Sequence, residues 1–445
     1  MRRRISALTL IFVCIVLGTL FLSQAADPSN NASAQVTSAA VMETKAFLPL
    51  ALRQAVLSDA VPTPPIPPGN ATPTPTVPLA TPTPIPTVSP EPTASPTPIP
   101  SWTTEIIDSE GVVGMWTSIA IDSNDRLHIS YVGCNGGDCF LKYATNANGS
   151  WTTAIIRGPG SGITSTVSPA STSIVVDSRG KVYIGYIDRW TNRARVMVRD
   201  TSGTWLEQKP LSEYAWGSYE INGLSLAVDK NDVVHLFATR WFGSDGTGYY
   251  NYAATLYTNN SNGTFDISSP VQSLSACSGG FFTLWAPSIY IDSNGRVHIS
   301  YVILTSYGDV WGHGYKTNKS GTWAGCWATA APGIPREVLH SNRYFAVDSQ
   351  GNVRWPKADP PWPSAYRDLS LALDSKDTAH VLGFSDGRLW HYELASSGTS
   401  PYALEIVDSS STAVGASNST AVDSHGRVHV SYFDGANGDL KHAVR

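Results

Sequence analysis

Residues Ser118–Tyr131 read S-I-A-I-D-S-N-D-R-L-H-I-S-Y, and close variants of this stretch recur five more times before the last residue. Each copy carries one aspartate, with a serine four residues before it and a histidine or tyrosine six residues after it. The aspartates are Asp122, Asp177, Asp229, Asp292, Asp374 and Asp423; the serines are Ser118, Ser173, Ser225, Ser288, Ser370 and Ser419; the third set is His128, Tyr183, His235, His298, His380 and His429. Self-similarity at a period of about 50 residues is typical of repeat proteins.

Each copy predicts short strands joined by tight turns. In the first copy, 118–121 and 127–131 alternate apolar and polar residues, which is the pattern of half-buried strands. Residues 140–145 and 150–156 add two more such segments, so one repeat predicts a four-stranded antiparallel unit. In the D-x-x-G/D turn, the first aspartate bonds the backbone ahead of it and the fourth residue takes a positive φ. That fourth residue is Gly180, Gly295, Gly426, Asp125, Asp232 or Asp377.

Four-stranded units repeated around an axis form the blades of a β-propeller, and six copies predict an all-β, six-bladed ring. We expect each fourth strand to begin at an aromatic residue, which is Trp151, Trp205, Phe265, Trp323 or Tyr402. The sixth copy ends after only three strands. Ser101–Asp108, S-W-T-T-E-I-I-D, nearly copies S-W-T-T-A-I-I-R at Ser150–Arg157. The N-terminal strand is therefore predicted to complete the last blade and close the ring, which removes exposed sheet edges.

One stretch, Ala324–Arg367, interrupts the regular spacing of the copies. It contains a damaged copy, F-A-V-D-S-Q-G-N-V-R-W, around Asp348. Tyr344 stands there in place of the serine, and Arg354 stands in place of the histidine. We interpret this stretch as a decorated loop or an extra hairpin. A ring of seven blades, with the damaged copy as a partial blade, is the alternative.

The residues before the repeats divide into three segments. Residues 1–25 combine three arginines, an apolar run and S-Q-A, which is the pattern of a secretory signal peptide. Residues 26–60 form a short polar spacer, and 61–100 are a Pro/Thr-rich linker whose T-P repeats favour an extended chain. The propeller is predicted over 101–445. This order predicts a secreted or cell-surface protein; an uncleaved signal segment that anchors the chain in a membrane is the alternative.

Charge and cysteine usage narrow the class of partner. The formal net charge is −5 at pH 7 and no basic stripe runs along the chain, which argues against nucleic acid as a partner. Four cysteines remain once Cys14 leaves with the signal, and an even number in an oxidising compartment favours disulfides. Proximity favours Cys134–Cys139 and Cys277–Cys326, although three pairings are formally open. No cofactor is implied, and a monomer is expected.

Residues that recur in every blade serve the architecture first. The repeated histidines share one face of their hairpin with the serine and a small residue, such as Ala120 or Ala421. We interpret them as structural, packed on that small residue and hydrogen-bonded between blades. Each lies in its own blade, so they cannot converge on one zinc ion, which needs nitrogens about 2 Å away. The D-S-N-G turns lack the further carboxylates of calcium loops, and no metal site is predicted.

The candidate binding residues lie where the copies differ. The loops between second and third strands and the links between blades share one face of the disc, and here they vary and are rich in aromatic residues. Flat rings beside aspartate, asparagine and arginine suit sugars, which present apolar faces and hydroxyl edges. The sequence therefore predicts a glycan-binding module. The candidate ligand-binding residues are Trp190, Trp241, Phe242, Tyr249, Tyr250, Tyr307, Trp311, Asp188, Asp245 and Asp309.

Two other functions remain open. The first is an extracellular carbohydrate-active enzyme, a glycoside hydrolase or polysaccharide lyase, that acts on the same face. Hydrolysis needs two carboxylates, and lyase chemistry needs a base such as His or Tyr. Asp188, Asp245, Asp309, Tyr307 and His313 are available, but no spacing singles out a pair, which favours binding over catalysis. The second is a scaffold for an extracellular protein partner.

Residues 101–445 resemble secreted bacterial β-propellers built of D-x-x-G-x-x-H-h-S-Y repeats, where h is apolar, a group loosely similar to the sialidase and Asp-box propellers. The third-to-fourth turns carry part of this resemblance, with D-T-S-G-T-W at Asp200–Trp205 and N-K-S-G-T-W at Asn318–Trp323. Both are one residue shorter than the Asp-box pattern S-x-D-x-G-x-T-W. Sialidases also carry an arginine in the first strand of the ring, and none lies between Trp102 and Asp125. The resemblance implies a propeller and does not imply sialidase activity.

Overall fold

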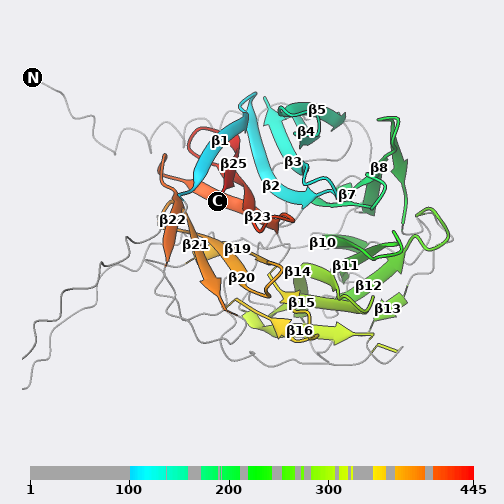
Figure 1. The fold of residues 1–445 in the computed structure, drawn as a ribbon. Helices are drawn as coiled ribbons and strands as arrows, with labels where there is room; N and C mark the ends of the chain where they lie inside the picture. Colours follow the sequence, from blue (N-terminus) through cyan, green and yellow to red (C-terminus); the bar gives the residue numbers. More distant parts are fainter. Residues whose placement is uncertain are drawn as a thin grey trace, which may run out of the picture. The chain divides into compact units, whose positions relative to one another are not determined.

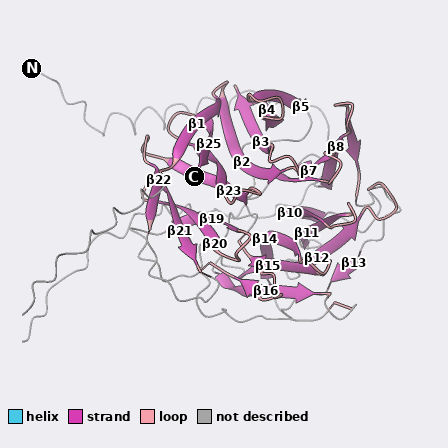
Figure 2. Cartoon of the chain, in the orientation of Figure 1, coloured by secondary structure: helices cyan, strands magenta, loops and turns pink. Residues whose placement is uncertain are grey.

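Strands and turns, without a helix, make up the part of the chain that the structure, a computed structural model, describes (Figure 2). None of these residues forms a helix of the length and apolarity that crossing a membrane requires. The described residues are 101–136, 138–158, 172–188, 191, 193–210, 219–242, 253–265, 272–274, 282–305, 310–318, 322–323, 344–356, 366–395 and 404–445. Among them, 219–220, 241–242, 253–254, 272–274, 282–283, 304–305, 310–311 and 366–367 are described by their backbone alone.

The strands form six antiparallel blades around an axis, which confirms the predicted six-bladed propeller (Figure 1). Blade one is β2 (Val112–Ile121), β3 (Leu127–Asn135), β4 (Asp138–Thr145) and β5 (Thr152–Arg157). Blade two is β6 (Thr172–Val176), β7 (Val182–Asp188), β8 (Arg193–Arg199) and β9 (Trp205–Gln208). Blade three is β10 (Tyr219–Val228), β11 (Val234–Phe242), β12 (Ala253–Asn259) and β13 (Gln272–Leu274).

The second half of the ring is less regular. Blade four is β14 (Phe282–Ile291), β15 (Val297–Thr305) and β16 (Val310–Thr317) within the described residues. Blade five is β19 (Tyr366–Leu373), β20 (Ala379–Ser385), β21 (Arg388–Leu394) and β22 (Glu405–Asp408). Blade six is β23 (Val414–Val422), β24 (Val428–Asp434), β25 (Asp439–Val444) and β1 (Thr103–Asp108).

The turns between first and second strands have the conformation that their residues predict. The φ angle is +80° at Gly180, +76° at Gly295 and +57° at Asp125. In blade one, the Asp122 carboxylate accepts the backbone N–H groups of residues 124 (2.8 Å) and 126 (2.9 Å). The same two bonds recur in the other five blades. The repeated aspartate is therefore a turn-forming residue.

Several of the repeated serines join neighbouring blades at their innermost strands. The Oγ of Ser118 accepts the N–H of Ile174 in blade two (3.3 Å), and the Oγ of Ser173 accepts that of Leu226 in blade three (2.9 Å). Across the closure of the ring, Ser419 of blade six accepts the N–H of residue 119 in blade one (3.2 Å). These bonds place a buried hydroxyl on an N–H that lies outside its own sheet, which satisfies both groups.

The N-terminal strand closes the ring, as predicted. β1 pairs antiparallel with β25, from Thr103 opposite Val444 to Asp108 opposite Leu440. It is therefore the outermost strand of blade six, beside the C-terminal strand (Figure 1). After three intervening residues the chain enters β2, the innermost strand of blade one. One short connection thus links the last blade to the first.

The damaged copy forms an extra hairpin, which is the predicted interpretation. β17 (Ala346–Val347) pairs with β18 (Val353–Arg354), and β17 contacts both β14 and β19. The Asp348 carboxylate closes the turn as in the blades, accepting the N–H of residue 352 at 2.7 Å. Ser349 donates to Asp377 of blade five at 2.5 Å, as Ser178 donates to Asp232 between blades two and three. The hairpin is therefore a shortened repeat that lies between blades four and five of the six-bladed ring.

The predicted starts of the fourth strands hold in blades one and two, where β5 begins one residue after Trp151 and β9 begins at Trp205. In blade three, Phe265 is buried in the core between blades two and three, the described part of the fourth strand is β13, and residues 266–271 lie outside the described residues, so the start of this strand stays a prediction. Trp323 packs edge-on against Tyr257 of blade three, with ring centroids 5.0 Å apart. Tyr402 lies outside the described residues.

The apolar core is divided among the junctions between blades. At the first junction, Leu141 and Tyr143 of blade one pack with Ile174 and Ile184 of blade two. At the axis, the innermost strands surround a cavity of about 320 Å³ whose lining is largely aliphatic and aromatic. Packing between twisted sheets, rather than within one, therefore holds the blades together.

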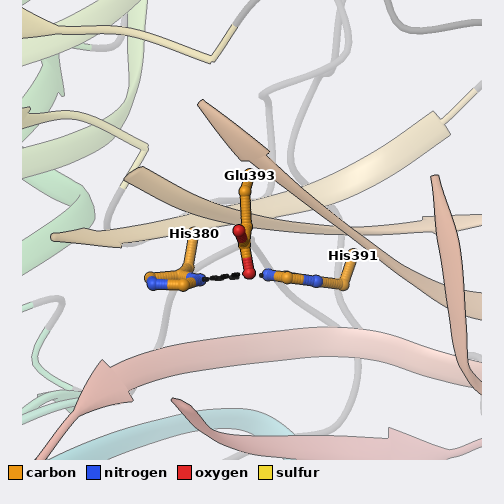
Figure 3. A group of neighbouring side chains, drawn as sticks. All are labelled: His380, His391 and Glu393. Carbon is orange, nitrogen blue, oxygen red and sulfur yellow. Dashed lines mark hydrogen bonds and ion pairs between the residues drawn. The ribbon is translucent and has the colours of Figure 1, made fainter. Parts of the chain in front are cut away.

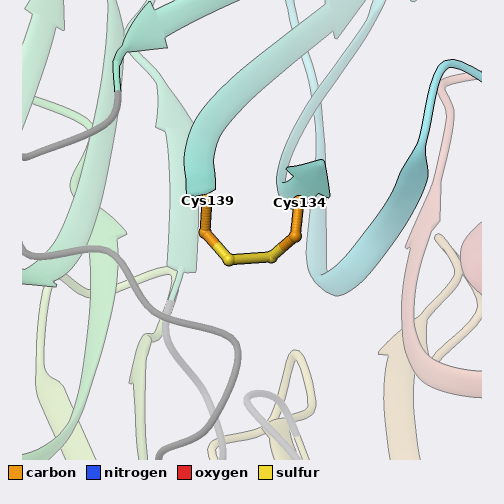
Figure 4. Close-up of a disulfide and its surroundings, with 2 residues drawn as sticks. All are labelled: Cys134 and Cys139. Atoms are coloured by element: carbon orange, nitrogen blue, oxygen red, sulfur yellow. A yellow bond between two sulfur atoms is a disulfide. The ribbon is translucent and has the colours of Figure 1, made fainter. Parts of the chain in front are cut away.

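One of the two predicted disulfides is present. Cys134 and Cys139 are directly opposite each other on β3 and β4 and are joined by a disulfide (Figure 4). The bond closes the loop between the second and third strands of blade one, on the face opposite the repeated aspartate turns. Cys277 and Cys326 lie outside the described residues, so their pairing stays a prediction.

Candidate functional site

The topology places four of the predicted binding residues on one face of three adjacent blades. Asp188 ends β7 of blade two, Trp241 and Phe242 end β11 of blade three, and Trp311 is the second residue of β16 in blade four. All four therefore border the loops between second and third strands. Blades two, three and four are neighbours, since β10 contacts both β6 and β14.

The remaining predicted ligand-binding residues are not described by the structure. Trp190, Tyr249, Tyr250, Tyr307, Asp245 and Asp309 lie outside the described residues. For Trp241, Phe242 and Trp311 the backbone alone is described. Their role in binding stays a prediction.

Asp188 is tied to its own turn. Its Oδ2 accepts the Thr191 hydroxyl at 2.8 Å and lies 3.8 Å from the Nε of Arg195, whose side chain is buried. The ion pair fixes the start of the loop between β7 and β8. The Asp188 carboxylate is therefore engaged by Thr191 and Arg195 at the end of β7.

The repeated histidines are structural, but one part of their prediction is wrong. They bond within their own blade rather than between blades. In blade four, His298 Nδ1 lies 2.6 Å from the Tyr315 hydroxyl, and its Nε2 lies 3.4 Å from the Asp292 carboxylate. The same arrangement joins His128 to Tyr143 and His235 to Tyr257. The histidine begins the second strand, so the nearest polar groups are its own turn and its own third strand; the serine on the innermost strand makes the contact between blades.

His313, a candidate base in the enzyme alternative, does not reach the solvent. It lies on β16 with 4% of its surface exposed and packs against Tyr344, with ring centroids 6.1 Å apart. Burial lowers the pKa of His313 to about 4. The imidazole is therefore neutral and sealed between blade four and the hairpin, which removes it as a catalytic base.

The buried His313 predicts an acid-sensitive fold. Its pKa is about 4 in the folded state and about 6.5 in an unfolded chain. Between these values the unfolded state binds the extra proton, so stability is complete above about pH 6.5 and falls as the pH drops toward 4. We expect His313→Phe to reduce this loss by about 3 kcal/mol, at about 1.4 kcal/mol per pKa unit. Urea unfolding at a series of pH values from neutral to pH 4 measures the free energy of unfolding. If it falls with pH as steeply in the variant as in the parent, His313 is not the cause of the loss.

A cluster that the sequence analysis missed lies in blade five (Figure 3). His380 of β20 and His391 of β21 stack with ring centroids 5.4 Å apart, and Nδ1 of the first lies 3.2 Å from Nε2 of the second. Glu393 of β21 approaches the same Nδ1 at 3.8 Å. Both histidines are buried, whereas the Glu393 side chain is 45% exposed. The available signal was the change from tyrosine to histidine in the third strand, visible when the copies are aligned.

Two buried triads join consecutive blades where a fourth strand ends. At the closure, Asp108 of β1 accepts the Tyr131 hydroxyl (2.6 Å) and pairs with the Lys142 ammonium (2.7 Å), both in blade one. Asp408 of blade five plays the same part toward Tyr432 (2.7 Å) and Lys441 (2.5 Å) of blade six. The tyrosine–carboxylate–lysine arrangement satisfies each charge inside the protein, so these residues serve architecture.

A polar groove of about 500 Å³ opens between the aspartate turns of blades two and three. Asp177, Asp200 and Asp232 line it. Each already accepts hydrogen bonds from neighbouring backbone or hydroxyl groups. The carboxylates of this groove are therefore engaged in turns and in the junction between blades.

No protein-family model and no curated protein matches this sequence. Solved structures resemble the fold. The polysaccharide lyase Uly1 has a TM-score of 0.48 and 11% identity over 76% of this chain and 90% of that chain. An alpha-L-arabinanase from Penicillium chrysogenum, complexed with arabinobiose, has a TM-score of 0.46 and 12% identity over 78% of this chain and 98% of that chain. A Trypanosoma rangeli sialidase, complexed with sialic acid, has a TM-score of 0.46 and 11% identity over 78% of this chain and 59% of that chain. These values carry no assignment of activity.

Proposed function

We propose that this chain is a secreted glycan-binding propeller that takes its ligand on the loops between second and third strands of blades two to four. The observation that carries the proposal is the position of non-repeated aromatic residues on adjacent blades. Trp241 and Trp311 stand at the edges of neighbouring loops on one face, and Asp188 borders the next loop. Aromatic faces flanked by charged and amide groups match the amphipathic surface of a sugar.

The face that carries the repeated aspartate turns is less suited to binding a ligand. Its repeated aspartates accept backbone N–H groups of their own turns, and in blade four Asp292, His298 and Tyr315 form a buried network. Groups whose hydrogen bonds are already satisfied gain little from a ligand. Secretion is supported by the signal-like residues 1–25 and by the Cys134–Cys139 disulfide, since such bonds persist in oxidising compartments.

Substitutions on the two faces should have opposite effects. We expect Trp241→Ala and Trp311→Ala in the full chain to weaken glycan binding by about tenfold or more, the equivalent of about 1.4 kcal/mol, with little change in melting temperature. His298→Ala should lower the free energy of unfolding by about 1–3 kcal/mol, because Tyr315 and Asp292 lose a buried partner. It should leave the affinity of the folded protein unchanged. A glycan array followed by calorimetry on the best glycan measures both.

The same experiment separates the alternatives. Loss of binding in His298→Ala at unchanged stability, with both tryptophan variants silent, would contradict the proposal. Release of reducing ends or of unsaturated products from a polysaccharide panel would replace it with the enzyme. An array without a hit, together with saturable binding of an extracellular protein, would replace it with the scaffold.

A further inference from the structure

Blade five departs from the repeat in its third strand. In blades one, three and four the group that faces the repeated histidine is a tyrosine hydroxyl, 2.6–2.7 Å from Nδ1. In blade five it is His391, and in blade six it is His442. Two facing ring nitrogens about 3 Å apart can share an N–H···N hydrogen bond or, when neither carries a proton, bind a cation between them. Of these two pairs, the one in blade five also has a carboxylate, Glu393, where blade six has Val444.

The three donor atoms lie at distances that suit a metal ion. His380 Nδ1 is 3.2 Å from His391 Nε2 and 3.8 Å from Glu393 Oε1, and all three atoms lie within 4.8 Å of one another (Figure 3). Tetrahedral zinc, with ligands at about 2.0–2.2 Å, separates its ligand atoms by about 3.3–3.5 Å. Glu393 is the half-exposed member, so a small rotation of its side chain completes the set.

Carboxylates stand behind both histidines. His380 Nε2 faces the Asp374 carboxylate at 3.8 Å, and His391 Nδ1 faces Glu405 at 3.6 Å. In metal sites, a carboxylate that is hydrogen-bonded to the outer nitrogen of a histidine leaves the lone pair of the inner nitrogen for the metal. Here both carboxylates lie slightly beyond hydrogen-bond distance, and the Arg445 guanidinium is 3.4 Å from His391 Nδ1. The inner nitrogens in this cluster are the two that face each other.

The charge of the cluster matches a divalent cation. Arg445 lies 2.5 Å from Glu405, 3.5 Å from Glu393 and 3.4 Å from His391 Nδ1. Three carboxylates and one guanidinium leave a net charge of −2.

The histidine pair in blade six carries a different net charge. His429 Nδ1 lies 3.1 Å from His442 Nε2, and the outer nitrogens face Asp423 (3.3 Å) and Glu105 (2.9 Å). Arg427 pairs with Asp423 at 2.5 Å. Two carboxylates and one guanidinium leave a net charge of −1, which a single shared proton neutralises. Blade six is therefore a matched control within the same molecule.

We propose that His380 Nδ1, His391 Nε2 and the Glu393 carboxylate bind one divalent first-row transition metal of the zinc class, with the remaining position open to water. Two imidazoles and one carboxylate suit this class, whereas magnesium and calcium prefer sets made of oxygen alone. The metal ties β20 to β21. The sequence prediction of no metal considered the repeated histidines, which lie in separate blades, and the D-S-N-G turns. His391 belongs to neither set.

A second group of possible ligands, Asp125, Asp423 and His425, is the internal competitor. Its carboxylates are already engaged, because Asp125 accepts the Ser424 N–H (2.9 Å) and hydroxyl (2.5 Å) and Asp423 pairs with Arg427. His425 is exposed. These bonds make it the weaker candidate.

Zinc binding to the full chain, purified without a histidine tag and stripped with a chelator, tests the proposal. We expect calorimetry to give one Zn²⁺ per chain and the melting temperature to rise on zinc addition, since a ligand of the folded state stabilises it. Calcium should do neither. His391→Tyr installs the residue of blades one, three and four and should fold, but bind zinc at least about 100-fold more weakly. Glu393→Gln, at a half-exposed position, should weaken zinc about 10–100-fold and leave the zinc-free melting temperature unchanged.

The control is His442→Tyr in blade six, which should bind zinc as the parent does. A parent chain that binds no zinc at millimolar concentration would overturn the proposal. Unchanged affinity in both His391→Tyr and Glu393→Gln would do the same. Loss of binding in His425→Ala alone would assign the ion to the competing group and would equally overturn it.

Discussion

Deletion of residues 101–108 is expected to lower the free energy of unfolding of the propeller by more than about 5 kcal/mol, beyond what single substitutions usually reach. β1 is the outermost strand of blade six and leads directly into blade one, so its loss opens the ring. β25 is left with an unpaired edge along Leu440–Val444, which invites pairing with another chain. Tyr131 and Lys142 of blade one also lose the buried Asp108 carboxylate.

Chemical denaturation and light scattering of the truncated chain measure this effect. The matched control removes residues 61–100 and keeps 101–108, and should melt like the parent because the ring stays closed. A chain without 101–108 that melts like the parent and stays monomeric would contradict closure by β1.

The substitution with the largest expected effect is Asp108→Asn. The Lys142 and Asp108 side chains are 7% and 5% exposed, and their charged atoms are 2.7 Å apart. Removal of one partner leaves a buried charge without compensation, which destabilises proteins by about 3–5 kcal/mol. We expect a loss in this range in urea unfolding, with unchanged far-ultraviolet circular dichroism of the folded chain.

A double variant separates the charge from the packing. Asp108→Asn combined with Lys142→Met removes both members of the pair, and should recover most of the loss because no charge stays buried alone. Asp408→Asn, at the junction of blades five and six, should behave like Asp108→Asn, since Lys441 is buried there in the same way. If each single variant lowers the free energy of unfolding by less than about 1 kcal/mol, these ion pairs contribute no more than exposed surface pairs do, and the prediction is wrong.

The architecture follows from local patterns, and these could be predicted. Alternation of apolar and polar residues predicts strands, and the D-x-x-G/D turns predict where they reverse, as the positive φ at Gly180 and Asp125 confirms. Repetition then predicts the blade count, and the near identity of Ser101–Asp108 to Ser150–Arg157 predicts the closing strand. Phe265 is buried in a core that blades two and three build together, and the pattern of one repeat does not show this packing.

For the candidate sites, too, the sequence predicted some features and missed others that depend on tertiary contacts. Repetition identified a set of histidines as structural, but it assigned their hydrogen bonds to the wrong partners. His391 is not one of the repeated histidines and was not considered, so the cluster that it forms with His380 and Glu393 was missed.

The sequence by itself determined the strand pattern, the turns, the number of blades and the strand that closes the ring, because each of these depends on neighbours in the chain or on a comparison of its own copies. The tertiary structure alone decided which residues meet across strands and blades. Asp108 reaches Lys142, and Arg445 reaches Glu405 and Glu393, only once the ring is closed and the strands are in register. Charges buried at such junctions are set by distances in space, and the local pattern of the chain does not encode those distances.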